Sequence, residues 1–186
     1  LQFGVFSNQK NPLINDLYFD EEHLMSLPER SYYQNKDLIK DFKEALTLFF
    51  KTLNKENPEG IAQNIIDFET HIANIYPLPE EFRKIIYDET NYTTLEKYNK
   101  RFTAFKLSSS FSSFSKKIAV RDFSGKTIDY LHSYIHSASV EELKNIALYH
   151  STIFAMDDAF PEVYNKFFEF KFKWLGGAKA RSPRQE

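Results

Sequence analysis

His132 and His136 are the residues of this 186-residue chain whose types and spacing come closest to a chemical motif. Two histidines four positions apart lie on one face of a helix, where both rings can bind the same zinc ion. The metallopeptidase version of this pair has a glutamate directly after the first histidine, as general base for the zinc-bound water, and Ser133 stands there instead. A structural zinc site would need further ligands from elsewhere in the fold. We therefore interpret the pair as ordinary histidines on a partly exposed helix.

The remaining polar candidates are better explained by secondary structure than by catalysis. Glu69 and His71 are two positions apart, so a helix directs them to different sides. Asp157–Asp158 precede a helix start, Glu141–Glu142 belong to a capping box, and Gly176–Gly177 end a helix without the lysine of a phosphate loop. No Gly-x-Ser-x-Gly sequence marks a serine nucleophile. The sequence therefore predicts no catalytic residue and no metal ligand, and it identifies no substrate-binding residue.

The composition limits the classes of function. Hydrophobic residues make up 42% and charged residues 27%, and 19 phenylalanines against one tryptophan predict a core filled largely by aromatic rings. The length suits one domain with a sizeable core, so we predict a single helical domain over residues 1–186. A net charge of −2 gives no electrostatic reason to expect nucleic acid or an anionic membrane as a partner. The absence of cysteine excludes disulfides, thiol catalysis and thiolate metal sites.

No segment of the sequence has the features of a membrane anchor or a signal peptide. No apolar run approaches the roughly 18–20 residues that a membrane helix needs. The N-terminal stretch lacks the basic region and the continuous apolar region of a signal peptide. The compartment does not follow from these features. The chain begins without an initiator methionine, which is typical of a mature or excised piece of a longer protein.

The elements that must position these residues are helices, and residues 58–76 show the most regular period. Apolar side chains recur there every three or four residues, at Ile61, Ile65, Phe68, Ile72 and Ile75. Asn57 suits the N-cap position and Pro58 the first helical position. Pro77 and Pro79 end the helix.

The preceding segment predicts a second helix that forms a hairpin with the first. Residues 37–53 carry an apolar face, and their lysines lie mostly away from it. The short connection over residues 54–58 favours two antiparallel helices lying side by side. The expected contacts place three residues of the earlier helix, Phe42, Leu46 and Phe49, against four of the later one, Ile61, Ile65, Phe68 and Ile72.

Capping signals and apolar periodicity predict further helices. The expected segments are Pro79–Tyr87, a helix after the capping box Thr93–Glu96, Lys126–His136, Ser139–Met156 and Pro161–Leu175 with Gly176 as its C-cap. Ser108–Ser110 interrupt the periodicity of residues 105–119, and Leu17–Phe19 and Val120–Gly125 are candidates for short extended segments. The predicted fold class is all-α, a bundle of seven to eight helices with room for one short strand near the N-terminus.

Four segments form an ordered series of short motifs. Residues 17–35 contain Leu-Pro-x-Arg-x-Tyr-Tyr, and residues 65–73 contain Phe-Glu-x-x-Ile-Ala. Residues 82–95 hold an arginine followed by Tyr-Thr-Thr-Leu, and residues 167–184 hold Phe-x-Phe, then Gly-Gly, then Pro-Arg. In this order the segments resemble the N-terminal region of the neprilysin and endothelin-converting-enzyme family of zinc metallopeptidases, which includes the bacterial oligopeptidase O members. The resemblance covers nearly the whole chain.

The resemblance implies a role without catalytic residues. In that family this region looks like the helical domain that faces a thermolysin-like catalytic domain across an internal chamber and limits which peptides enter. The implied parent activity is hydrolysis of internal peptide bonds by a zinc-activated water. The family's His-Glu-x-x-His helix and third zinc ligand lie downstream of the matching region, so no catalytic residue carries over to this chain. Gln185 also departs from the tryptophan usual in the family.

The resemblance also implies partners. They are the catalytic domain of the same polypeptide and small peptides in the chamber, with zinc as cofactor of the parent and none in this chain. The implied parent is a bacterial protein of the extracellular space, the cell envelope or the cytoplasm. An excised domain would leave interface residues uncovered, so weak self-association is expected. The candidates are Phe3, Val5, Phe6, Trp174 and Leu175.

Two other interpretations compete with this one. The chain could instead be a stand-alone helical binding module that has lost the protease. An independent enzyme is the weakest interpretation, because no acid–base pair or activated nucleophile is visible. The reading frame after Glu186 distinguishes the first two, since a His-Glu-x-x-His sequence there supports the protease and a stop codon supports the module.

Overall fold

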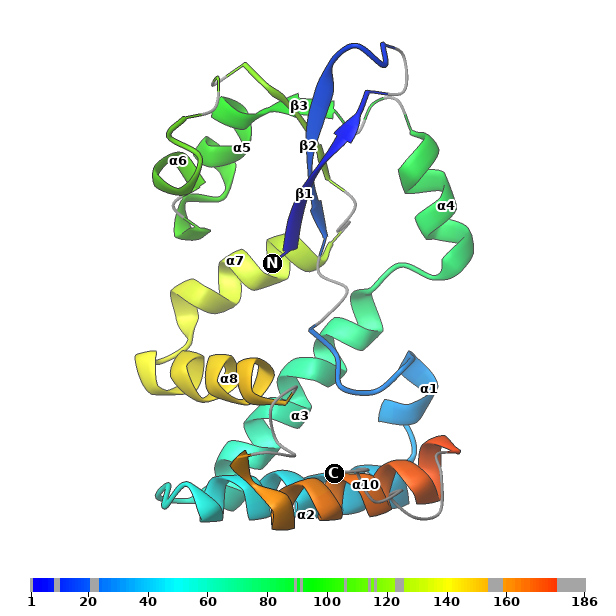
Figure 1. Cartoon of the computed structure of the whole chain (residues 1–186), viewed down its shortest axis with the longest axis vertical. Coiled ribbons are helices and arrows are strands. Elements are labelled where there is room, and N and C mark those ends of the chain that lie inside the picture. Colours follow the sequence, from blue (N-terminus) through cyan, green and yellow to red (C-terminus); the bar gives the residue numbers. More distant parts are fainter. Residues whose placement is uncertain are drawn as a thin grey trace, which may run out of the picture. The chain divides into compact units, whose positions relative to one another are not determined.

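The computed structural model describes residues 2–8, 11–20, 24–88, 90, 92–105, 107–113, 115, 117–122, 126–153 and 159–176. The chain packs into two compact units. Unit 1 consists of Leu1–Ser26 and His71–Ala138, and unit 2 consists of Leu27–Thr70 and Ser139–Glu186. Each unit therefore combines two stretches that are distant in sequence (Figure 1). The prediction that residues 1–186 make a single domain stays a prediction.

Unit 1 contains a small mixed sheet. Its strands are β1 (Gln2–Ser7), β2 (Asn15–Asp20), β3 (Tyr92–Thr94) and β4 (Ala119–Asp122), in the order β1-β2-β4-β3. β2 pairs antiparallel with β1 and parallel with β4, so Leu17 lies opposite both Val5 and Val120. Leu17 and Val120 are fully buried. The expected segment Leu17–Phe19 falls within β2. The expected segment Val120–Gly125 overlaps β4 at residues 120–122, and its last three residues lie outside the described residues. β1 and β3 are additional strands.

Short helices complete the core of unit 1. They are α4 (Pro79–Tyr87), α5 (Leu95–Arg101), the 3-10 turn η1 (Thr103–Phe105), α6 (Leu107–Ser110) and α7 (Thr127–Ser137). Neither α4 nor η1 has a buried residue. Buried side chains of α5, α6 and α7, and of the residues that follow α5 and α6, join those of the sheet in one cluster: Leu17, Leu95, Tyr98, Phe102, Leu107, Phe111, Val120 and Ile128. The hydroxyl of Thr94 accepts from the Lys97 N–H and caps α5. The cap therefore lies one residue after the predicted Thr93, which belongs to β3.

Unit 2 is built from longer helices around aromatic side chains. They are α1 (Arg30–Tyr33), α2 (Lys36–Thr52), α3 (Pro58–Ile75, whose last turn belongs to unit 1), α8 (Val140–Thr152) and α10 (Pro161–Leu175). The ring centroids of Phe42 and Phe170 are 5.4 Å apart, and those of Phe49 and Tyr149 are 6.0 Å apart. Aromatic pairs of this kind add stabilisation beyond the area they bury. These rings connect α2 to α10 and α8.

The antiparallel direction of the predicted hairpin of α2 and α3 is confirmed, whereas its predicted apolar contacts stay a prediction. Lys43 contacts Gln63 and Lys51 contacts Glu59, which is the order expected of antiparallel neighbours. The aromatic residues of α2 also meet α10 and α8, which the sequence did not predict. The reason is the width of the face, because one neighbouring helix cannot cover all of its buried residues. They are Leu38, Phe42, Ala45, Leu46, Thr47, Phe49 and Phe50.

The ends of the helices follow the predicted capping signals. The side chain of Asn57 accepts from the Gly60 N–H at 3.2 Å at the start of α3. Ser139 and Glu142 form the predicted reciprocal capping box of α8. Gly176 ends α10 in the left-handed conformation, with φ of 73°. Met156, where α8 was expected to end, lies outside the described residues.

The predicted fold class is confirmed, since the described chain is mostly helical with one small sheet (Figure 1). The sheet is larger than the single short strand that the sequence suggested. Of its additional strands, β3 has only three residues, too few to show a recognisable alternation. β1 has six residues, but the adjacent apolar residues Val5 and Phe6 interrupt its alternation.

Phe68 offers a test of the buried face of α3. Its ring is only 4% exposed, so Phe68→Ala should lower the free energy of unfolding by about 3–5 kcal/mol. Asn64→Ala on the exposed side of the same helix is the control, with an expected change within about 0.5 kcal/mol. Denaturant unfolding measures both. A loss below about 1 kcal/mol for Phe68→Ala would contradict the packing described here.

Candidate functional site

The fully buried carboxyl group of Glu69 is the centre of a polar cluster in unit 2. The Tyr33 hydroxyl donates to Glu69 Oε2 at 2.8 Å, and the Leu27 backbone N–H donates to the same hydroxyl at 3.1 Å. Nε2 of His150 lies 3.3 Å from Glu69 Oε1. The cluster therefore joins the segment before α1, α1 itself, α3 and α8 through one carboxyl group.

Burial sets the protonation of this cluster. It lowers the pKa of the His150 imidazole to about 4, so the ring is neutral at pH 7. Burial, followed by the neighbouring charge of Glu69, raises the pKa of Tyr33 far above its ordinary value, so the phenol keeps the proton that it donates. A carboxyl group, an imidazole and a phenol could do acid–base chemistry in an open cleft. Here Glu69 and Tyr33 are buried and the His150 side chain is only 15% exposed, so the cluster is suited to fixing the packing of unit 2.

The histidine pair on α7 has the predicted arrangement on one helix face. The ring centroids of His132 and His136 are 4.7 Å apart. His132 also lies against Phe102 and Phe105, with Thr103 Oγ1 at 3.5 Å from its Nε2. Within the described ranges, no three His, Asp or Glu side chains gather as a metal site requires. In the part of the chain that the structure describes, the pair therefore has no third ligand of this kind beside it.

Glu69 and His71 point to different sides of α3, as their spacing predicts. Glu69 is buried in the cluster of unit 2, whereas the exposed His71 stacks on Tyr130 with ring centroids 4.0 Å apart. Glu141 and Glu142 lie in the first turn of α8. Hydrogen bonds from Lys55 to Glu141, and from Ser139 to Glu142, lower the pKa of both carboxyl groups. Asp157, Asp158 and Gly177 lie outside the described residues.

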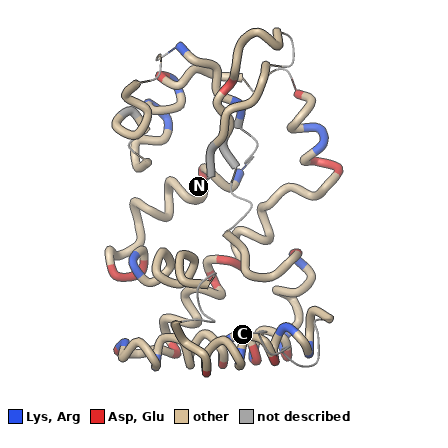
Figure 2. Tube along the Cα trace, in the orientation of Figure 1, with Lys and Arg blue, Asp and Glu red and all other residues tan. Residues whose placement is uncertain are grey.

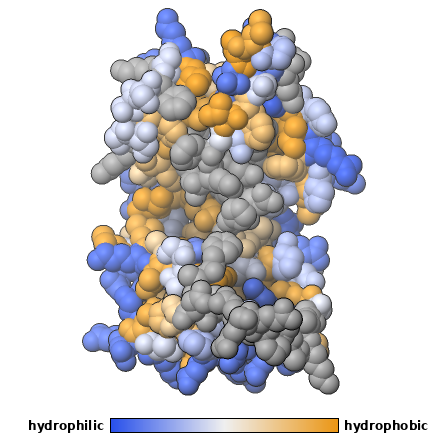
Figure 3. All heavy atoms as spheres, viewed as in Figure 1, coloured by the Kyte–Doolittle hydropathy of each residue, from blue (hydrophilic) through white to orange (hydrophobic). Residues whose placement is uncertain are grey.

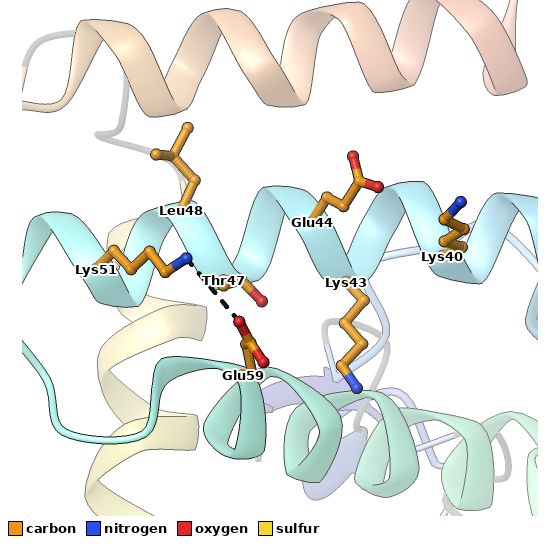
Figure 4. A pocket seen from close by; sticks show the side chains of 7 residues that line it. All are labelled: Lys40, Lys43, Glu44, Thr47, Leu48, Lys51 and Glu59. Atoms are coloured by element: carbon orange, nitrogen blue, oxygen red, sulfur yellow. Dashed lines mark ion pairs between the residues drawn. The ribbon is translucent and has the colours of Figure 1, made fainter.

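A charged groove runs along α2 (Figure 4). Its volume is about 390 Å³, and its walls are Lys40, Lys43, Glu44, Thr47, Leu48 and Lys51 of α2 with Glu59 of α3. Lys43 donates to Gln63, Lys51 lies 4.0 Å from Glu59, and Glu44 lies 3.4 Å from Lys166 of α10. Figure 2 shows both signs of charge mixed along α2. Most of these charges have a partner, so the groove does not define the charge of a ligand.

The sequence did contain a signal for the buried cluster. Glu69 lies within the apolar stripe of α3, between Ile65 and Ile72, where a charged side chain needs a buried partner. Tyr33 belongs to the Leu-Pro-x-Arg-x-Tyr-Tyr motif, yet nothing local shows that its hydroxyl reaches α3. His150 has no sequence signal at all, because its role depends on how α8 packs.

The fold has counterparts among solved structures of a zinc metalloprotease. It matches the open state of ZMP1 from Mycobacterium tuberculosis, with a TM-score of 0.75 and 18% identity over 98% of this chain. It matches the inhibitor complex of the same protein, with a TM-score of 0.76 and 18% identity over 98%. The chain spans only 30% and 29% of those two chains. At this identity the comparison shows a shared fold.

The family is shown by a sequence model. The N-terminal model of peptidase family M13 matches residues 1–186, the full length of the chain. This chain therefore belongs to peptidase family M13, and the resemblance to the N-terminal region of neprilysin-like enzymes is confirmed. A search of curated proteins found no matching sequence. Among the helices of the described residues, none has the length and apolar character to span a bilayer.

Tyr33→Phe tests the hydrogen bonds of the buried cluster. The change removes the donor to Glu69 and the acceptor of the Leu27 N–H, so two buried polar groups lose a partner. The expected loss in free energy of unfolding is about 1–3 kcal/mol. Tyr32→Phe, on the adjacent and only half-buried residue of α1, is the matched control. Equal effects of the two substitutions would show that the hydroxyl of Tyr33 contributes nothing specific.

His150 should make the stability depend on pH. Its pKa is about 4 in the folded chain against an ordinary 6.5, so the unfolded chain takes up the proton first as the pH falls. The contribution of His150 is complete above about pH 6.5 and decreases toward pH 4, by about 3 kcal/mol at most. His150→Gln should flatten this part of the profile in denaturant titrations between pH 7 and pH 4.5. The control is His136→Gln on an exposed residue. Parallel profiles for the wild type and His150→Gln would contradict the assignment.

Proposed function

We propose that this chain is the non-catalytic helical part of a neprilysin-like zinc metalloendopeptidase, in which it forms the wall of a chamber that restricts peptide substrates. The observation that carries the proposal is the match of the N-terminal family model to all 186 residues. The sequence contains no His-Glu-x-x-His, and among the described residues no third His, Asp or Glu lies with its one histidine pair of suitable spacing. The chain also spans less than a third of the two metalloprotease chains that share its fold.

These observations suggest separate roles for this chain and for the remainder of the polypeptide. Zinc and its ligands would belong to the remainder of the polypeptide, where the metal would supply an activated water for hydrolysis of internal peptide bonds. The residues of this chain would exclude large substrates by their packing. Aromatic contacts between α2, α8 and α10 and the buried cluster of Glu69 connect the helices of unit 2, which supports a role as a chamber wall. Small peptides and the catalytic part of the same polypeptide are the proposed partners.

Peptide cleavage provides the test. The isolated 186-residue chain should hydrolyse no quenched fluorescent peptide, with or without added zinc, because it lacks the glutamate after His132 and a third ligand. The full polypeptide should cleave the same peptide, and a chelator should abolish the activity. Chelator-sensitive cleavage by the isolated chain that survives repurification would contradict the proposal.

The role as a size filter needs its own measurement. Peptides of increasing length around one scissile sequence should show a falling kcat/KM with the full polypeptide. A kcat/KM that does not change with peptide length would contradict the role as a size filter, but it would not contradict the assignment to a peptidase. Sequencing the reading frame beyond Glu186 provides a separate check, because a stop codon there would remove the protease altogether.

A further inference from the structure

The apolar residues expected to be uncovered near the two ends of the chain have different surroundings. Trp174 and Leu175 are half-buried within unit 2, where the Trp174 indole N–H donates a hydrogen bond to α2. Val5 and Phe6 are 50% and 59% exposed, and the side chain of Phe3 lies outside the described residues. Hydrophobic and hydrophilic side chains are mixed over the face drawn in Figure 3. Weak self-association therefore stays a prediction, and the chemistry of particular side chains is the better indicator of a ligand.

The two histidines of α7 hold their imidazole rings close together. The ring centroids of His132 and His136 are 4.7 Å apart, with an angle of 80° between the ring planes. Two imidazoles bound to one tetrahedral metal ion, at metal–nitrogen distances of about 2.0–2.1 Å, have their centroids about 5 Å apart. The rings are therefore already near the separation that a shared ion would impose. The spacing in the sequence places them on one helix face but does not show this distance.

The ring of His132 is held by the residues around it. It packs edge-to-face against Phe102 and Phe105, with ring centroids 5.7 and 6.2 Å away. Its Nε2 lies 3.5 Å from the hydroxyl of Thr103. His136 is exposed, so its ring is free to adjust around a bound ion. One ligand is thus preorganised by η1 and the end of α5, which lowers the entropic cost of binding.

The charges near the pair are compatible with a bound cation. Asp129, one turn before His132, accepts two hydrogen bonds of 2.8 Å from Arg101, so this ion pair is neutral as a whole. His136 lies in the last turn of α7, where the helix dipole favours a positive charge. Neutral imidazole nitrogen suits the later first-row metals such as nickel, copper and zinc, whereas magnesium and calcium prefer oxygen ligands.

We propose that His132 and His136 together bind one late first-row divalent metal ion, with water completing its coordination. Among the described residues no third His, Asp or Glu joins the pair, so the ion would exchange readily. Ser133 stands where a metallopeptidase has its general base, so the bound ion would not hydrolyse peptides. Binding requires only this chain and is separate from the proposed size filter.

A bound ion would stabilise the half of α7 that is packed least. The buried residues of this helix, Thr127, Ile128 and Leu131, all lie in its first half. Residues 132–137 are half-buried or exposed. Chelation by two side chains one turn apart would fix the last turns as a helix. Because the ion binds the folded helix and not the unfolded chain, it should raise the stability of the whole chain by mass action.

Isothermal titration calorimetry of the untagged 186-residue chain with Ni²⁺ tests the site. One Ni²⁺ should bind per chain near neutral pH, and Mg²⁺ should give no binding because it prefers oxygen ligands. Cu²⁺ should bind more tightly than Ni²⁺ and Co²⁺ more weakly, in the order expected for a site of nitrogen ligands. Ni²⁺ should also raise the Tm of the chain.

Two variants change the pair without changing the core. His136→Ala leaves one imidazole and should weaken Ni²⁺ binding by at least about tenfold, since the chelate is lost. His136→Ser combined with Ser137→His keeps the number of histidines but moves the second ring five positions from the first, away from the shared helix face. This shifted pair should bind as weakly as His136→Ala. His71→Ala, at an exposed histidine of α3, is the matched control and should bind Ni²⁺ like the wild type.

The outcomes separate a built site from unspecific binding. Equal Ni²⁺ affinity in the wild type, His136→Ala and the shifted pair would show an adventitious ion only and would overturn the proposal. Failure of the wild type to bind Ni²⁺ would also overturn it. Circular dichroism without metal establishes that the variants are folded, so a loss of binding is not a loss of structure. Loss of both the binding and the rise in Tm in the two folded variants, with His71→Ala unchanged, would support the site.

Discussion

The buried carboxyl group of Glu69 is the constraint on which unit 2 most depends. A carboxyl group removed from water needs hydrogen-bond donors, because leaving it without them is costly. The Tyr33 hydroxyl donates one hydrogen bond to Glu69, and the same hydroxyl accepts a hydrogen bond from the Leu27 N–H. The packing of α8 then brings His150 to the second carboxyl oxygen. One group thus fixes the relative register of segments that are distant in the sequence.

This cluster gives a physical meaning to the motifs by which the family is recognised. Leu27 and Tyr33 belong to the Leu-Pro-x-Arg-x-Tyr-Tyr segment, and Glu69 belongs to the Phe-Glu-x-x-Ile-Ala segment. Both segments look functional because they contain residues that are capable of acid–base chemistry. The side chains of Tyr33 and Glu69 and the backbone N–H of Leu27 instead meet inside unit 2, where they stabilise the packing. Membership of a peptidase family is therefore compatible with motif residues that serve the packing of unit 2.

Local features of the fold could be predicted from the sequence, and distant ones could not. The caps at Asn57, Ser139 and Gly176 were predictable because each depends on a few neighbouring residues. The pairing of Phe42 with α10 was not, since any of several apolar helices could have covered that face. For the candidate sites, spacing alone placed His132 and His136 together and separated Glu69 from His71. It could not indicate that Glu69 meets His150, because that contact depends on the packing of α8.

The alternation of the two units along the sequence has a consequence for how the chain folds. Unit 1 begins with the β1–β2 hairpin, but β4, which lies parallel to β2, is synthesised about a hundred residues later. Unit 2 likewise begins at Leu27 and is completed only by α8 and α10. Contacts of such high sequence separation slow folding, because long loops must close before burial stabilises them. Neither unit can be complete while the nascent chain is short. The β1–β2 hairpin therefore stays without its partner strand β4 until most of the chain has been synthesised.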